Sequence, residues 1–243
     1  MLARDCVASI RRWGARDTFG QALLAATDEL SAPDDRTIAF RLSRPFPLLP
    51  DALAKTAPSP CCIMPERLAA TDPFKQVSEM VGSGPFRFLA DERVPGARVA
   101  YARFDGYVPR PDGAPSRTAG PKRAGFDRVE WLVIPDASTS AAALQAGEAD
   151  WWLAANPDLL PRLRADRRLV VRMQDPTGII GTMRFNQLHP PFDNPAMRRA
   201  VLGAVTQADH MQAVSGPDRA GWADGVGYFA PAPRWPAARA CRR

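Results

Sequence analysis

The sequence predicts an α/β fold, because segments with the pattern of β-strands alternate along it with segments that have the pattern of helices. Apolar and polar side chains alternate over residues 36–42 and 126–134, whereas residues 138–149 and 194–206 carry helix-capping signals. The 243 residues are 46% hydrophobic and 24% charged, so the chain is able to bury the core of one or two domains. No apolar run approaches the roughly 18 residues that cross a bilayer.

The first half of the chain predicts one helix followed mainly by strands. One stripe of the first helix is apolar: Cys6, Val7, Ile10 and Trp13. Gly14 follows its last turn, and no capping residue precedes it, as though the chain before it were cut off. The elements expected are a helix at 3–13, a turn at 32–35, a strand at 36–42, a helix after Pro50, and strands at 85–91, 97–104 and 126–134.

The second half predicts helices separated by shorter strands. Ser138 or Thr139 is expected to cap a helix that Gly147 ends. Asn194 is expected to cap the last helix, with Pro195 in its first position. The elements expected are helices at 138–149, 158–165 and 194–206 and strands at 169–173 and 178–188, after a long irregular loop at 107–125.

In residues 81–88, VGSGPFRF, Ser83 lies between two glycines. A Gly-Ser-Gly sequence of this kind is often found in loops that bind anions. A phosphate loop would need a lysine after its last glycine, and a nucleophile elbow would need one residue between the serine and each glycine. Neither pattern is present. Pro85 and the alternation of Phe86 and Phe88 indicate a strand, so we interpret the segment as a tight turn that leads into it, with a structural role for Ser83.

The net charge of +6 comes almost entirely from arginine. A basic chain of this kind could favour acidic partners, but its arginines are scattered, and the densest group lies at residues 162–168. A nucleic-acid-binding surface would need a basic stripe with interleaved aromatic residues. The sequence shows no such stripe, so nucleic-acid binding remains only an alternative.

The cysteines and histidines do not form a catalytic or metal-binding pattern. Cys61 and Cys62 are adjacent, and no Cys/His spacing suits a metal. A hydrolase that uses Ser83 or a carboxylate pair remains a second alternative, although His189 and His210 are the only histidines available as a base. The sequence predicts no cofactor and no metal site.

Four segments, in order, resemble the family 5 extracellular solute-binding proteins, the dipeptide, oligopeptide and nickel receptors of ABC importers. The segments are LARDCVASIRRW (2–13), VGSGPFRF (81–88), FDRVEWLVIPDASTSAAALQAGEADWW (126–152) and MRFNQLHPPFDNPAMRRAVLGAV (183–205). Each motif alone is weak, but their common order and spacing are specific for the family. The resemblance covers residues 2–229 and does not indicate one ligand.

The resemblance implies a two-lobed α/β fold of the periplasmic-binding-protein type II class, incomplete in this chain. Residues 1–175 would be a partial first lobe, residues 176–229 a crossover strand and the start of the second lobe, and residues 230–243 a disordered tail outside the family pattern. Family members are longer at both ends and begin with an export signal. The charged N-terminus here lacks the apolar core of one, so we expect a truncated or frameshifted gene product.

The resemblance also implies a function without catalysis. Such a receptor closes its two lobes on a peptide or another small solute and then docks, as a monomer, on a membrane permease in the periplasm or outside the cell. Phe185 and Asn186 fall where the family's crossing strand faces the ligand cleft. Phe19 and Cys61 fall in segments that line the cleft in the family, and ordinary packing is the alternative for all four.

Trp151 and Trp152 also require an interpretation. Two adjacent tryptophans could form an aromatic wall for a cationic or apolar ligand. The same pair could instead cover one face of a sheet, and this is the interpretation we prefer.

Overall fold

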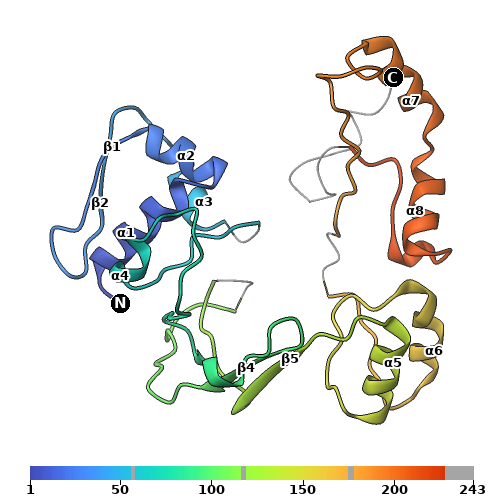
Figure 1. The fold of residues 1–243 in the computed structure, drawn as a ribbon, viewed down its shortest axis with the longest axis horizontal. Helices are drawn as coiled ribbons and strands as arrows, with labels where there is room; N and C mark the ends of the chain where they lie inside the picture. Colours follow the sequence, from blue (N-terminus) through green and yellow to red (C-terminus); the bar gives the residue numbers. More distant parts are fainter. Residues whose placement is uncertain (56–57, 116–118, 175–177, 228–243) are drawn as a thin grey trace. The chain divides into compact units, whose positions relative to one another are not determined.

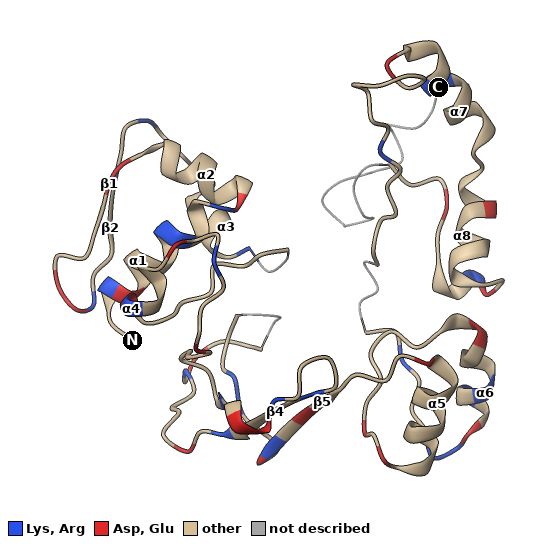
Figure 2. Cartoon of the chain, viewed as in Figure 1, with Lys and Arg blue, Asp and Glu red and all other residues tan. Residues whose placement is uncertain are grey.

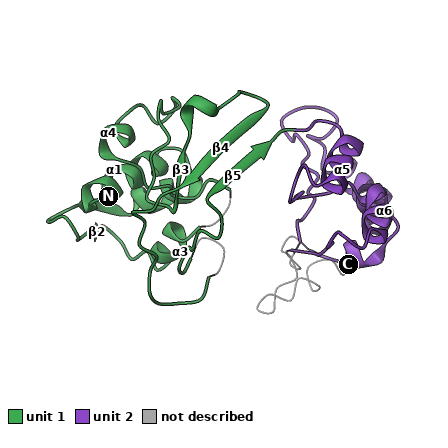
Figure 3. Cartoon of the chain, turned by 90° about the horizontal axis from the view of Figure 1, so that it is seen from below, with its two compact units in different colours: residues 1–133 green, residues 134–243 purple. Residues whose placement is uncertain are grey.

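A computed structural model describes residues 1–55, 58–115, 119–174 and 178–227 (Figure 1). The chain divides into two compact units, residues 1–133 and residues 134–243 (Figure 3). Among the described residues, no helix has both the length and the apolar character needed to cross a membrane.

The first unit begins with two helices in close contact, α1 (Ala3–Gly14) and α2 (Thr18–Ala25). The predicted apolar stripe of α1 is confirmed at Val7, Ile10 and Trp13, which are buried, whereas Cys6 is only partly buried. No side chain caps α1 from Leu2, as expected. Instead the carboxylate of Asp5 accepts a hydrogen bond from the Leu2 backbone N–H at 2.7 Å.

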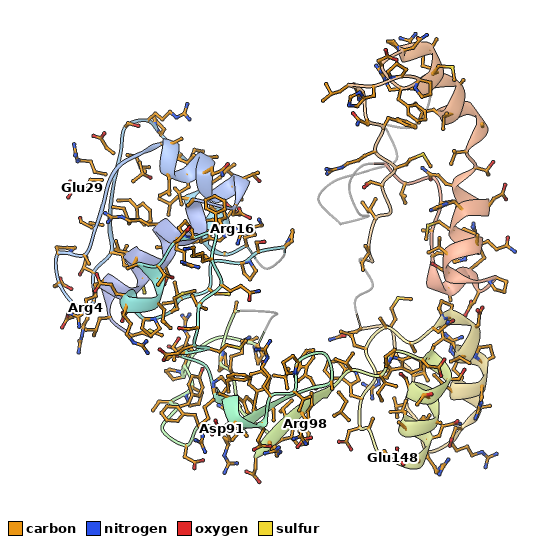
Figure 4. All side chains as sticks on the ribbon, viewed as in Figure 1. Arg4, Arg16, Glu29, Asp91, Arg98 and Glu148 are labelled. Atoms are coloured by element: carbon orange, nitrogen blue, oxygen red, sulfur yellow. The ribbon has the colours of Figure 1, made fainter. Side chains whose placement is uncertain are left out.

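Two short helices, α3 (Leu49–Leu53) and α4 (Glu66–Ala69), complete the helical part of this unit. Arg4 on α1 forms a 3.8 Å ion pair with Glu66 on α4. Arg16 lies just after α1, where Figure 4 labels it. Its guanidinium is 5.5 Å from the ring centre of Phe74. These contacts attach the segment around α4 to the surface of the first helix.

A two-stranded antiparallel sheet follows α2 in the sequence. Strands β1 (Thr27–Ser31) and β2 (Ala39–Leu42) pair with Leu30 opposite Phe40. The predicted strand at 36–42 is thus confirmed in its second half. Its predecessor β1 was not expected from the sequence, because Asp28 and Glu29 are poor strand formers.

Strands β3 (Phe86–Phe88), β4 (Arg98–Arg103) and β5 (Arg128–Leu132) form an antiparallel sheet in the order β3-β4-β5. The three predicted strands are confirmed, although each is shorter than expected. A short 3₁₀ turn, η1 (Ala90–Glu92), lies between β3 and β4. Residues 82–85 form no helix before β3, in agreement with a turn that leads into a strand.

Acidic and basic residues alternate along the chain of this sheet and its turns (Figure 2). Arg128 pairs with Glu92 and Glu130, and Arg103 pairs with Asp105 and Asp127. All these side chains are more than a third exposed, so each pair contributes little to stability. They show that part of the arginine content is matched locally by carboxylates.

The core of the first unit consists of two clusters around α1. The first contains Val7, Ile10 and Leu30. The second contains Trp13, Leu23 and Ala52. Phe40 packs against both, which joins the small β1-β2 sheet to the helices.

The described part of the second unit consists of helices and irregular segments. The helices are α5 (Ala137–Ala146), η2 (Pro157–Leu159), α6 (Leu160–Ala165), α7 (Pro195–Ala204), α8 (Gln207–Ser215) and η3 (Arg219–Gly221). The predicted end of α5 is confirmed, because Gly147 adopts a φ of 77° that favours glycine. The Asn194 cap of α7 is also confirmed, with the Ala196 N–H 2.8 Å from its side-chain oxygen.

Three predictions for this unit are wrong. The cap of α5 is Asp136, not Ser138 or Thr139, since its carboxylate accepts the Thr139 N–H at 2.7 Å. Residues 169–173 and the described residues 178–188 are not strands. A strand requires a hydrogen-bonded neighbour, and residues 134–174 and 178–227 supply none for these segments.

Candidate functional site

Phe19 lies in the first turn of α2, and Asp17 fixes that turn. One carboxylate oxygen of Asp17 accepts the N–H groups of Phe19 at 3.0 Å and of Gly20 at 3.2 Å. The ring of Phe19 is partly buried, and its centre lies 6.2 Å from that of Phe46 in a tilted arrangement. One part of the ring therefore packs in the protein, and another part is open to solvent.

The second carboxylate oxygen of Asp17 forms an ion pair with Lys55, just after α3. The side chains of Asp17 and Lys55 are only 7% and 18% exposed. The pKa of the Asp17 carboxyl is lowered, chiefly by the hydrogen bond from Lys55. The hydrogen bonds from the backbone N–H groups of Gly20 and Phe19 lower it further. Asp17 thus joins α2 to the chain that leads toward Cys61.

The segment that carries Cys61 lies along α1. The indole N–H of Trp13 donates to the Ser59 carbonyl at 2.8 Å, and Ser9 bonds to the backbone of Met64. Cys61 is partly buried against both core clusters, whereas Cys62 is exposed. Burial raises the pKa of the Cys61 thiol to about 11, so this thiol is neutral near pH 7.

Phe19 and Cys61, which the sequence placed 42 residues apart, therefore contact the same core cluster of Trp13, Leu23 and Ala52. The structure thus packs both candidate residues of the first unit against one cluster. Much of each side chain contributes to packing.

Phe185 and Asn186 lie in the second unit, in an irregular segment before α7. The ring centre of Phe185 is 4.8 Å from that of Phe192. The exposed Asn186 accepts the Leu188 N–H at 3.1 Å through its side-chain oxygen, and this bond does not use its amide N–H₂ group. Phe185 and Asn186 therefore belong to a different unit from Phe19 and Cys61.

Arg198 fixes the chain after Phe185 to the start of α7. Its guanidinium donates to the carbonyls of Phe192 at 2.5 Å and Asp193 at 3.1 Å. Arg198 thus contacts Asp193 through the backbone carbonyl and not through the carboxylate. Trp151 is 68% exposed, and Trp152 is partly buried. The expectation that this pair covers a sheet is wrong within the described residues, because residues 134–174 and 178–227 contain no strand.

The sequence interpretation missed Asp17 and Lys55. Asp17 immediately precedes Thr18 and the helix α2, and an aspartate before a helix is a recognisable capping signal. Nothing in the local sequence identifies Lys55 as its partner, because 38 positions separate the two residues. Within the described residues, no three His, Cys, Asp or Glu side chains form a group suited to a metal ion.

Comparison with protein families gives a match over residues 1–239 to "Bacterial extracellular solute-binding proteins, family 5 Middle". The probable peptide ABC transporter periplasmic-binding protein y4tO of Sinorhizobium fredii is 40% identical over 218 residues, which are 89% of this chain and 40% of the relative. The dipeptide-binding protein of Escherichia coli is 28% identical over 80% of this chain and 34% of its own length. The chain thus spans less than half the length of these curated relatives.

Solved structures show the same fold. The periplasmic binding protein DppA of Helicobacter pylori, in complex with the peptide STSA, matches 88% of this chain and 42% of its own, with a TM-score of 0.67 and 21% identity. NikA of Brucella suis, in complex with Fe(III)-EDTA, matches 94% of this chain and 45% of its own, with a TM-score of 0.60 and 19% identity. The expected type II periplasmic-binding-protein fold is confirmed over these parts.

Proposed function

Because this chain belongs to the family 5 extracellular solute-binding proteins of bacteria, we propose that it is part of the binding component of an ABC importer. Its solute would be a peptide or a similarly small molecule, taken up from the periplasm or the cell exterior. The observation that carries this proposal is the 40% identity, over 89% of the chain, to a probable peptide-binding protein of such a transporter. Relatives with names of this kind are binding proteins, and they favour neither a hydrolase nor a nucleic-acid-binding protein.

The solute is proposed only as a class. Relatives and structural neighbours are described as binding dipeptides, glutathione, heme, a nickel–histidine complex or mannopinic acid. These molecules are small and differ in charge, so a shared fold accommodates very different ligands. A peptide is favoured here because the relative with 40% identity is named as a peptide-binding protein.

We propose that residues 1–175 belong to the first lobe of the receptor, that residues 176–229 begin the second, and that the two lobes close on the solute. Residues 230–243, for which the sequence predicts a tail, lie outside the described residues. We propose Phe185 and Asn186 as solute-contacting residues of the second unit, and Phe19 and Cys61 as solute-contacting residues of the first. Asn186 suits this role because its N–H₂ group could donate to a peptide carbonyl, and the partly exposed ring of Phe19 could cover an apolar side chain.

Uptake of labelled di- and tripeptides by the host cell tests the proposal. We expect deletion of the gene to reduce uptake of at least one peptide and the intact gene to restore it. A gene with Asn186→Ala should restore uptake less well, whereas one with Ser83→Ala should restore it fully. Unchanged uptake of every peptide after deletion would contradict a peptide-binding function, and full restoration by Asn186→Ala would contradict the role of Asn186.

A further inference from the structure

We propose that Asp17 and Lys55 are positioning residues that hold the chain leading to Cys61 against the Phe19 turn of α2 and so shape the first unit's part of the solute site. This inference rests on the proposed function in one respect, namely that Phe19 and Cys61 belong to a solute site. The contacts on which it depends are independent of that function.

The first observation is that one carboxylate serves two purposes. Asp17 uses one oxygen to fix the N–H groups of Phe19 and Gly20 and the other to bind the ammonium group of Lys55. The orientation of the Phe19 turn and the position of Lys55 are therefore set by the same side chain. Lys55 lies six positions before Cys61.

The second observation is the environment of this ion pair. Most other ion pairs in the described residues join side chains that are more than a third exposed, such as Arg67 with Glu79 at 57% and 48%, but Asp17 and Lys55 are 7% and 18% exposed. A buried pair loses its water, so removal of one partner leaves the other without compensation. The pair is thus able to fix local geometry, which an exposed pair does only weakly.

The third observation concerns the other end of the same segment. Trp13 and Ser9 bond to the backbone at Ser59 and Met64, so α1 fixes the chain on either side of Cys61. Lys55 supplies a separate attachment, to α2. Loss of the Asp17–Lys55 pair should loosen the chain before Ser59 first, and we expect this opening to extend to Cys61 while α1 stays folded.

Thiol labelling measures this local loosening without any ligand. The chain would carry Cys62→Ser and Cys241→Ser, so that Cys61 reports on the segment and Cys6, on α1, reports on the unit as a whole. Labelling with iodoacetamide would be followed for both thiols in the same molecule by peptide mass spectrometry. Because both are partly buried in the structure, the ratio of their rates separates a local opening from unfolding of the unit.

Two variants remove the pair from opposite sides. Asp17→Asn keeps the oxygen that caps α2 but removes the charge, and Lys55→Met keeps the length of the side chain. We expect each variant to raise the labelling rate of Cys61 relative to Cys6 by about tenfold. The double variant should show the same ratio as each single variant, since all three lose the same interaction. Glu79→Gln, which breaks an exposed pair in the same unit, is the matched control and should leave the ratio unchanged.

An unchanged ratio in both variants would overturn the proposal, and so would a parallel rise at Cys6, which would indicate a general loss of stability. Peptide uptake by cells that carry the same two variants, without the cysteine changes, tests the link to the solute site. Full uptake despite a tenfold change in labelling would also overturn the positioning role. If the wild-type protein supports no peptide uptake, the proposed function fails, and the labelling ratio still decides whether the pair positions the segment.

Discussion

The hydroxyl group of Ser9 bonds to both backbone polar groups of Met64. It donates to the Met64 carbonyl at 3.1 Å and accepts the Met64 N–H at 3.0 Å. Ser9 is only 1% exposed, so solvent has little access to its hydroxyl. One side chain on α1 therefore satisfies two backbone groups of a segment 55 positions away.

Ser9→Ala should lower the free energy of unfolding of the first unit by about 1–3 kcal/mol, because the Met64 N–H and carbonyl lose their partner in a partly buried place. Urea unfolding followed by hydrogen exchange of the α1 amides measures this change. Ser83→Ala, which alters an exposed serine in the irregular segment before β3, serves as the control and should change the value by less than about 0.5 kcal/mol. Equal effects of the two substitutions would contradict the role given to Ser9.

Gly20→Ala should destabilise the contact between α1 and α2. A Cβ atom at Gly20 would lie 2.7 Å from the Cα of Gly14 and 3.0 Å from the ring of Trp13, and backbone cannot move aside easily. We expect the free energy of unfolding of the first unit to fall by about 1–3 kcal/mol, although alanine usually stabilises a helix more than glycine does. Urea unfolding with hydrogen exchange at the α2 amides would show it.

Gly203→Ala provides the matched comparison in α7. Nothing lies within 4 Å of the Cβ position there, so alanine should raise the local stability of α7 by up to about 1 kcal/mol. Hydrogen exchange of the α7 amides measures this gain. A stabilising effect at both glycines would show that the close approach at Gly20 does not limit the packing of α2.

Local patterns in the sequence predict the helices and strands whose own residues determine them. The stripe of Val7, Ile10 and Trp13 identifies α1, and Gly147 identifies the end of α5, because each depends on neighbours within one or two turns. Strand β1 could not be found in this way. Its exposed Asp28 and Glu29 are tolerated because Arg41 on β2 pairs with both, and this pairing is not visible before the strands are assembled.

The site depends still more on contacts between distant residues. Resemblance to the family suggested Phe19 and Cys61, and the contact of both with one core cluster appears only in the fold. The expected strands at 169–173 and 178–188 have apolar residues, but Val170 is 75% and Ile179 is 96% exposed. An apolar run indicates that burial of its side chains is favourable. It does not specify which neighbouring strand would pair with the run.

The labelling of Cys61 in the wild-type chain should depend strongly on pH. The thiolate is the reactive form, and a pKa raised by burial from 9.0 to about 11 leaves about a hundredfold less thiolate at pH 8. We expect iodoacetamide to modify the exposed Cys62 first, with the rate at Cys61 still rising above pH 10. Each thiol is followed separately in Cys61→Ser and Cys62→Ser chains, and in urea the two rates should become similar. Equal rates in the folded chain at pH 8 would contradict the burial of Cys61.

The ion pair of Asp17 and Lys55 should also make stability depend on acid. Its carboxyl has a pKa below the ordinary value of 3.8 in the folded chain, chiefly because Lys55 bonds to it. The unfolded chain therefore binds a proton at this group more readily, and the ionised carboxylate stabilises the fold at pH values above 3.8. This stabilisation is lost as the pH falls from 3.8 through the lowered folded pKa.

Asp17→Asn removes the titrating group but keeps the cap of α2. The free energy of unfolding should be lower than in the wild type by about 1–3 kcal/mol at pH 7, and this difference should shrink as the pH falls below 3.8. Urea unfolding at several pH values, with α2 amide exchange as the local readout, gives the difference directly. Other carboxylates with lowered pKa values, such as Asp5 and Asp34, titrate in both proteins and therefore cancel. A difference that stays constant from pH 7 to well below 3.8 would mean that the shape of the Asp17 side chain, and not its charge, holds Lys55 in place.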